Sequence, residues 1–341
     1  DEIGYKLEID VDVAGWATEV ANTGTQATTY SDTRLTSSES YAYRVSAISD
    51  GGTGAVSATA TEETIPAQVT GLTATTISPT QINLSWNNIT GDDENGYFIE
   101  RKIGAGGWST LVANTGNQDT TYSDTSLTVT TLYTYRVSAI SDGGTGTASA
   151  EASDTTFPNP PTSLSAVTFD DTRIDLSWTA PVAGSVDGYK IERESPVGNG
   201  FSTLVENTGN TLTTYNDSGL SLLTQYNYRV SAWSTAGIGD TATDDTTTLS
   251  TPPTSLIVYP EGTSETDLNL EWIAPVPSTG INGYKIEMES SIGGGFSVIQ
   301  ANTSNTNTYY NDTGRVKIHS IITGCQLLLR LEVLTRQTHM P

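Results

Sequence analysis

The residue types that most often perform nucleophilic or metal chemistry are confined to residues 315–341 of this 341-residue chain. The only cysteine, Cys325, and both histidines, His319 and His339, lie there. A histidine-based triad or a thiol nucleophile needs one of these types, so residues 1–314 exclude both kinds of catalysis. We therefore predict that the chain is not an enzyme, with no catalytic residue and no cofactor.

Carboxylates are the other groups that could do chemistry, and they are abundant. The net charge is −24, and residues 1–314 carry 38 acidic against 11 basic side chains. Nucleic acids and anionic membranes are bound by basic surfaces, so neither is expected as a partner. Acidic clusters at 92–94, 170–171 and 244–245 leave calcium as an alternative to a simply solvated surface. Their spacing differs and matches no EF-hand loop, so we predict no metal site.

These side chains must be positioned by a repeated unit. Tyr-Arg-Val-Ser-Ala occurs at 43–47, 135–139 and 228–232, and Gly-Tyr-x-Ile/Leu-Glu occurs four times, first at 4–8. Trp86, Trp178 and Trp272 are 92 and 94 residues apart, which is the length of a whole domain.

The register of the repeats sets the domain boundaries. We predict the C-terminal part of a domain at 1–65, complete domains at 66–157 and 158–250, and the N-terminal part of a domain at 251–314. Prolines open the three later copies, as suits linkers and edge strands. Because 82–86 and 133–139 alternate apolar and polar residues, the fold class is all-β, with sandwiches as the architecture.

Together these motifs resemble tandem fibronectin type III domains of a prokaryotic surface or secreted protein. The match is carried by the tryptophan, by the Gly-Tyr-x-Ile-Glu strand, and by a leucine six residues before a tyrosine that precedes Tyr-Arg-Val. The resemblance implies seven-stranded immunoglobulin-like sandwiches without a disulfide, the first and last copies being incomplete. It also implies core tryptophans Trp86, Trp178 and Trp272, and a tyrosine corner at Tyr41, Tyr133 and Tyr226.

Strand alternation predicts which side chains face the core. In the second copy the inward positions are Leu72, Ile82, Leu84, Trp86, Ile99, Leu127, Tyr135, Val137 and Ala139. The outward positions are Asn83, Ser85, Glu100, Arg136 and Ser138. Glu100 and Arg136 should form a cross-strand pair, repeated as Glu192 with Arg229 and Glu8 with Arg44.

Aromatic residues outside the core are the candidates for recognition. Trp16, Trp108, Phe201 and Phe296 share one repeat position, which favours a common structural role over a binding platform. Trp233 instead replaces an isoleucine found in the other copies and precedes the 234–237 loop. We therefore predict Trp233 as a contact residue, with a domain–domain junction as the alternative.

Residues 315–341 break the repeat. Allowed codons for 322–328, read one base out of phase, encode Asn-Tyr-Arg-Val-Ser-Ala-Ile, which is the strand expected there. We interpret 315–341 as a frameshifted tail, the alternative being a distinct segment such as a basic apolar anchor. Under this interpretation Cys325 and the histidines form no cluster, and the last domain lacks its two final strands and folds poorly.

Two functions fit these features. The first is a non-catalytic extracellular or cell-surface array, serving as a spacer or as adhesion, protein-binding or glycan-binding modules. The second is an accessory stalk of an extracellular enzyme, such as a polysaccharide hydrolase. The expected partners are other proteins, surface polysaccharide and neighbouring repeats of the same chain, with no membrane insertion in this segment. Sequons such as Asn216 leave glycosylation open.

The frameshift hypothesis makes a direct prediction about the gene. We expect resequencing of the DNA across the codons for Gly314 and Arg315 to restore one base and to continue the repeat into Tyr-Arg-Val. An unchanged DNA sequence would mean either a genuine deletion or a genuine C-terminal segment, and transcripts read through both flanks would separate the two.

Overall fold

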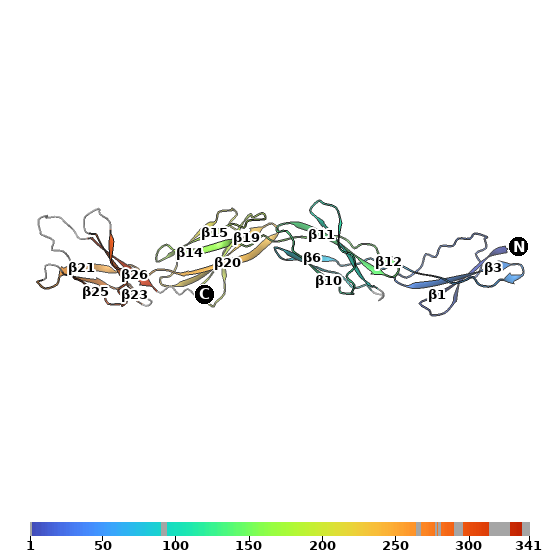
Figure 1. The fold of residues 1–341 in the computed structure, drawn as a ribbon, viewed down its shortest axis with the longest axis horizontal. Helices are drawn as coiled ribbons and strands as arrows, with labels where there is room; N and C mark the ends of the chain where they lie inside the picture. The colour runs from blue at the N-terminus through green and yellow to red at the C-terminus, as the bar shows by residue number, and fades with distance from the viewer. Residues whose placement is uncertain are drawn as a thin grey trace. The chain divides into compact units, whose positions relative to one another are not determined.

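The computed structural model describes residues 2–89, 94–263, 267–276, 278, 281–289, 296–313 and 328–335. No helix occurs among these residues, and hence none that is long and apolar enough to cross a membrane (Figure 1). Backbone contacts divide the chain into two units, of which the first comprises 1–159, 183–185 and 234–239, and the second comprises the remainder. The predicted all-β class is confirmed.

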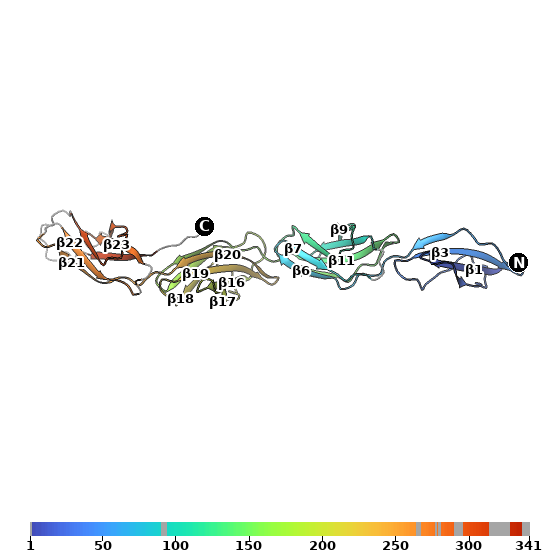
Figure 2. The ribbon, with the colours of Figure 1, turned by 90° about the horizontal axis from the view of Figure 1, so that it is seen from below.

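The second copy is a two-layer sandwich whose strands are visible in Figure 2. One sheet has the order β10-β7-β6; the other has the order β12-β11-β8-β9, with β13 also paired to β11. The strands are β6 (Thr73–Ser78), β7 (Gln81–Ser85), β8 (Gly96–Ile103), β9 (Ser109–Val112), β10 (Thr121–Thr125), β11 (Leu132–Ser141), β12 (Gly144–Thr145) and β13 (Ala152–Thr155).

The third copy repeats this arrangement with one long last strand. Its sheets have the orders β14-β15-β18 and β17-β16-β19-β20. The strands are β14 (Thr162–Thr168), β15 (Arg173–Thr179), β16 (Gly188–Glu194), β17 (Ser202–Val205), β18 (Thr214–Ser218), β19 (Gln225–Ser234) and β20 (Gly237–Thr247).

The first copy contains only the sheet that corresponds to β12-β11-β8-β9. Its strands are β1 (Glu2–Val11), β2 (Ala17–Val20), β3 (Ser40–Ser49), β4 (Gly52–Thr53) and β5 (Ala60–Glu63). Val45 is 39% exposed, whereas Val137 at the same repeat position is fully buried. The difference arises because no second sheet covers this face among the described residues.

The fourth copy has two three-stranded sheets, β21-β22-β25 and β24-β23-β26. The strands are β21 (Thr254–Pro260), β22 (Leu268–Ile273), β23 (Ile281–Glu289), β24 (Ser297–Gln300), β25 (Tyr309–Asp312) and β26 (Leu328–Thr335).

Strand β26 corrects one expectation about this copy. It lies antiparallel to β23, as β11 lies beside β8, so the prediction that both final strands are missing is wrong for one of them. The physical reason is that 329–334 alternates Leu-Arg-Leu-Glu-Val-Leu, a period-two pattern that suits a strand. The other tail residues, including Cys325, His319 and His339, lie outside the described residues.

Large side chains from both sheets fill the core of each complete copy. Ile82, Leu84, Ile99, Val137 and Ala139 are at most 2% exposed, and Leu72 packs partly buried against them. Trp86 is 5% exposed and meets the ring of Tyr97 edge-on at 5.0 Å, as Trp178 meets Tyr189 and Trp272 meets Tyr284 at 4.9 Å. Such pairs add to the free energy of burying the two rings.

Ser138 lies at an outward position of β11, as alternation predicts, yet only 4% of it is exposed. Because β11 lies in the interior of its sheet, flanked by β8 on one side and by β12 and β13 on the other, a small outward side chain is covered by its neighbours.

The tyrosine hydroxyls before each Tyr-Arg-Val accept a backbone hydrogen bond from five residues upstream. Tyr41 accepts from the Thr36 amide at 2.8 Å, Tyr133 from Thr128 at 2.9 Å, and Tyr226 from Ser221 at 2.8 Å. Each bond fixes the entry into the strand that follows.

A buried polar cluster joins the two sheets of the second copy. Asp124 on β10 is 3% exposed and accepts two hydrogen bonds from Arg101 of β8, at 3.0 and 2.8 Å. The Tyr135 hydroxyl of β11 donates to the same carboxylate at 2.9 Å. Burial and the Asp124 charge raise the pKa of Tyr135, which keeps it a donor. We call this Asp–Arg–Tyr cluster the inter-sheet clasp.

The third copy contains the same clasp, built from Asp217, Arg193 and Tyr228. In the first copy Ile9 occupies the position of the arginine. Of the two clasp partners, Asp32 therefore has only the tyrosine, whose Tyr43 hydroxyl donates to it at 2.9 Å. The fourth copy has Met288 there. The complete clasp is therefore a property of the two complete copies.

A loop of sequence Asn-Thr-Gly closes the other end of the domain. The Thr115 hydroxyl accepts from the Tyr97 amide at 2.9 Å, and the Asn114 side chain accepts from the Gly116 amide at 2.8 Å. Gly96 has φ +146°, and a Cβ there would overlap the Asn114 carbonyl oxygen and lie 2.8 Å from the Gly116 nitrogen. Glycine is therefore required at the Gly-Tyr step.

We predict that Asp124→Asn destabilises the second copy by about 2–4 kcal/mol, because it leaves the Arg101 charge without its partner inside the domain. The value is set below that of a fully buried pair because the Arg101 side chain is 24% exposed. Hydrogen exchange of peptides from 67–155, followed by mass spectrometry, measures the effect. The exposed Asp119→Asn is the matched control, and equal exchange in the two variants would contradict the prediction.

Candidate interaction surface

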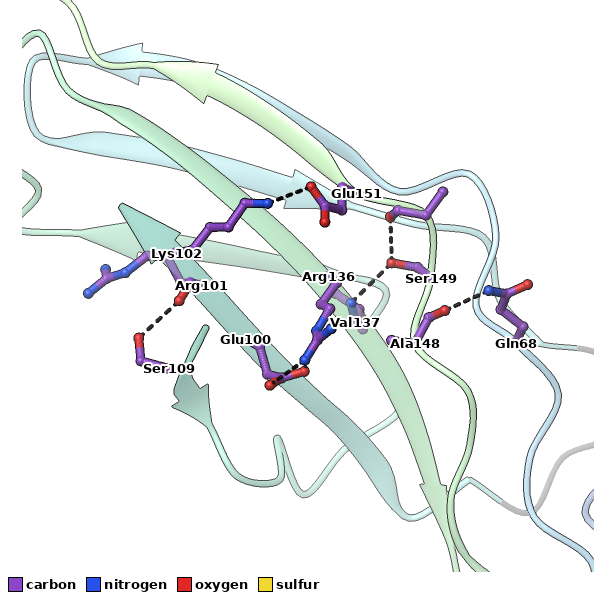
Figure 3. Close-up of polar contacts among 11 residues, drawn as sticks. Gln68, Glu100, Arg101, Lys102, Ser109, Arg136, Val137, Ala148, Ser149 and Glu151 are labelled. Carbon is purple, nitrogen blue, oxygen red and sulfur yellow. Dashed lines mark hydrogen bonds and ion pairs between the residues drawn. The ribbon is translucent and has the colours of Figure 1, made fainter. Parts of the chain in front are cut away.

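The sheet face that points away from the core in the second copy carries a network of charged side chains (Figure 3). Arg136 of β11 stands opposite Glu100 of β8 and donates two hydrogen bonds to it, at 2.5 and 2.9 Å. Lys102 of β8 reaches Glu151 at 2.8 Å, near the start of β13. The predicted cross-strand pair is therefore confirmed.

The pair recurs at the same register in the other copies. Arg229 donates to Glu192 at 2.7 and 2.9 Å, and Arg44 donates to Glu8 at 2.9 Å. A lysine two residues before the glutamate adds a second cation at Glu8, through Lys6 at 2.8 Å. Because these pairs are only partly exposed, they hold neighbouring strands in register more firmly than free surface pairs would.

An aromatic ring covers each of these arginines. The guanidinium carbon lies 4.1 Å from the Trp16 ring centre for Arg44, 4.3 Å from Trp108 for Arg136, and 4.4 Å from Phe201 for Arg229. Cation–π contacts of this kind are favourable at distances below about 6 Å. The predicted structural role of this aromatic position is confirmed in three copies; Phe296 in the fourth is 43% exposed.

Backbone-directed hydrogen bonds attach the flanking segments to the same face. In Figure 3 the Ser149 hydroxyl accepts from the Val137 amide at 3.1 Å, and the Gln68 side chain donates to the Ala148 carbonyl at 2.6 Å. The Ser109 hydroxyl donates to the Arg101 carbonyl at 2.9 Å. These bonds position the network and leave none of its members as an activated nucleophile.

Nearly all lysine and arginine side chains of the repeats form ion pairs within their own domain. Of the eleven lysines and arginines before residue 314, ten form an ion pair within their own copy: Lys6, Arg44, Arg101, Lys102, Arg136, Arg173, Lys190, Arg193, Arg229 and Lys285. Acidic groups are in large excess, so the surface that a partner meets is negative.

The acidic clusters do not converge on a cation. Within the described ranges no three His, Cys, Asp or Glu side chains are close enough to hold a metal ion. Asp170 accepts a hydrogen bond from the Thr172 amide at 2.8 Å, and Asp244 accepts one from the Ala166 amide at 2.7 Å. Both carboxylates therefore pair with backbone amides. Asp92 and Asp93 lie outside the described residues.

Trp233, the predicted contact residue, is the last residue but one of β19 and lies opposite Gly188 of β16. Its side chain is half-buried, and its carbonyl accepts from the Asp187 amide at 2.8 Å. The ring therefore lies beside a residue without a side chain. Alternation identified Tyr135 of the clasp as an inward residue but did not identify Asp124 or Arg101, although the inward register position of Arg101 was a signal for the clasp.

The pair in the third copy predicts how stability responds to pH. Hydrogen bonds from Arg229, with the charge of Lys190, hold the pKa of Glu192 below its usual value although burial opposes this. An unfolded Glu titrates near about pH 4.3. The pair therefore stabilises the domain above that pH, and this contribution is lost as pH falls through the lower folded pKa.

We expect the stability of the third copy to fall more steeply below about pH 4.3 in the native chain than in Glu192→Gln, which lacks the titrating group. Hydrogen exchange of peptides from 159–248 at several pH values measures this. Glu206→Gln, whose side chain is 67% exposed, is the control and should retain the native slope. Parallel pH profiles for the native chain and Glu192→Gln would contradict the argument.

Similar proteins include Exoglucanase B and Protein sidekick-2. The chain is 31% identical over 252 residues to Exoglucanase B from Cellulomonas fimi, which covers 66% of the chain and 21% of that protein. It is 28% identical over 236 residues to Protein sidekick-2 from Mus musculus, which covers 63% of the chain and 11% of that protein. The chain thus spans only 21% and 11% of the length of these two relatives.

Among solved structures, the FN1–FN3 domains of chicken CNTN1 match with a TM-score of 0.33 and 20% identity, covering 72% of this chain and 89% of that one. A two-domain segment of chicken tenascin matches with a TM-score of 0.34 and 16% identity, covering 53% and 99%. The model of the fibronectin type III domain matches residues 67–155 and 159–248, more than half of the chain. The chain belongs to the fibronectin type III domain family.

Proposed function

We propose that the chain is part of a non-catalytic, extracellular or cell-surface array in which the domains act as spacers and adhesion modules. The observation that carries this proposal is the repetition of one sandwich with a filled core, in which the lysines and arginines pair with carboxylates of the same domain. In the two complete copies the filled apolar core leaves no space between the sheets for two opposed carboxylates, and residues 1–314 contain neither histidine nor cysteine.

One relative is by name a receptor, which supports a role of the array in binding a partner. Protein sidekick-2 and the netrin receptor DCC of Homo sapiens, which is 30% identical over 171 residues, are large proteins of which this chain matches about a tenth. Linked modules gain effective concentration, so several weak contacts suffice to hold a protein or a surface polysaccharide. The negative surface favours partners without strong negative charge.

Trp233 is the proposed contact residue for such a partner. It lies at the end of β19 beside the 234–237 loop, where recognition residues of loops are commonly displayed. Trp233→Ala should weaken partner binding without unfolding the third copy. A contact with the neighbouring domain is the competing explanation for the residue.

A specific similarity favours a second candidate function. Exoglucanase B shares 31% identity over 252 residues, which suits an accessory stalk of an extracellular polysaccharide hydrolase. The two candidates differ in what the gene encodes next to this segment. Further repeats and a surface anchor favour the array, whereas a catalytic domain in the same reading frame favours the stalk.

A spacer under tension should unfold one domain at a time. When single molecules of the chain are stretched, we expect the second and third copies to give separate steps of about 300 Å each, since about 90 residues extend by about 3.3–3.6 Å apiece. Asp124→Asn should lower the force of one step only. A single cooperative step for the whole chain would contradict independent modules.

A further inference from the structure

The second copy has an open groove where the edge strands of its two sheets, β9 and β10, approach each other. The hollow has a volume of about 450 Å³, within the range of small-molecule sites. In the second copy its walls include Asn114, Asn117, Asp119, Thr121, Tyr122 and Ser123. We call this the β9–β10 groove.

The lining recurs through the repeats. Asn-Thr-Gly at 114–116 reappears at 22–24 and 207–209, and as Asn-Thr-Ser at 302–304, each followed by Tyr-x-Asp in β10 or its counterpart. The hollow of the first copy differs, because Tyr5, Leu7 and Val45 also line it, so that it opens onto the inner face of a sheet that no second sheet covers among the described residues. The threonine of the motif anchors its loop through a hydrogen bond of its hydroxyl, whereas the hydroxyls of Thr121 and Ser123 anchor no loop.

Several polar groups of the groove are left without a partner among the described residues. These are the hydroxyls of Thr121, Tyr122 and Ser123, the amide nitrogen of Asn117 and the carboxylate of Asp119. Asn117 uses only its side-chain oxygen, which accepts from the Asp119 amide at 3.2 Å. The groove therefore presents donors and acceptors together, beside a partly buried tyrosine ring that packs against the core.

The chemistry of the lining selects the class of ligand. It contains no lysine or arginine, so it does not suit an anion, and its single carboxylate does not suit a divalent cation. Hydroxyls and an amide beside an aromatic ring match a neutral molecule that carries many hydroxyls and an apolar ring face. That description fits a neutral oligosaccharide.

An extended peptide is the competing occupant, because it could pair with the edge of β10. Strand β10 is only five residues long, and its Asp124 points into the domain, where Arg101 holds it. Short edge strands with inward charges resist the addition of a further strand. The groove therefore favours contacts through side chains over backbone pairing.

We propose that the β9–β10 groove is a weak binding site for a neutral oligosaccharide chain. The proposal rests on the adhesive part of the proposed function and names its ligand class. The binding site and the spacer role are tested independently, because domains whose grooves bind no sugar would still unfold in separate steps when stretched. Repetition of the groove would allow one polysaccharide to engage several copies.

The test titrates the isotope-labelled 341-residue chain with cellohexaose, xylohexaose and mannohexaose up to about 10 mM, a range that detects millimolar affinity. We expect at least one sugar to shift the backbone amide resonances of 112–123. The triple variant Thr121→Val, Tyr122→Phe, Ser123→Ala should weaken this binding at least fivefold, since each substitution keeps the volume or shortens the side chain while removing a hydroxyl.

Thr147→Val is the matched control, because Thr147 is exposed, follows β12 in the other sheet of the same copy and does not line the groove. It should bind as the native chain does, and unchanged exchange of the triple variant shows that it is folded. The proposal is overturned if none of the three sugars shifts these resonances, or if the triple variant binds equally well. Shifts caused by an extended threonine-rich hexapeptide alone would overturn it in favour of a peptide.

Discussion

The burial of one carboxylate between two sheets is the constraint around which each complete domain is organised. Asp124 cannot remain charged in the interior without partners, and Arg101 with Tyr135 supplies them from the opposite sheet. The clasp thereby sets how β10 sits against β8 and β11, which apolar contacts alone specify less sharply. It also places a charge inside an edge strand, which discourages pairing with other chains.

The pairing of charged side chains within the domain also determines the properties of its surface. Arg136 is held between Glu100 and the Trp108 ring, so a cation that could have recruited an anionic partner instead fastens β8, β9 and β11 together. Because the basic side chains are paired in this way, the excess acidic side chains determine the charge of the surface that a partner meets. Neutral hydroxyl-rich ligands meet the least electrostatic opposition, and the β9–β10 groove lies in a stretch with a single carboxylate.

Much of the fold could be predicted because strand alternation is a local property. The pairing of Glu100 with Arg136 followed from their outward positions on neighbouring strands. Tyr97 was missed, although it is fully buried, because the Gly-Tyr step was used only as a repeat marker. Ser138 was placed on the outward face but its burial was not predicted, because alternation does not reveal how closely neighbouring strands cover a small side chain.

By itself, the sequence determined the repeat length, the all-β class, the register of the Glu–Arg pairs and the exclusion of histidine and thiol chemistry within residues 1–314. Each depends on residue type or on a period of two along one strand. Only the tertiary structure decided that Asp124 meets Arg101, that β26 takes its place beside β23, and that hydroxyls of β10 remain free in a groove. These outcomes depend on how strands distant in the chain approach one another, a distance that no local pattern specifies.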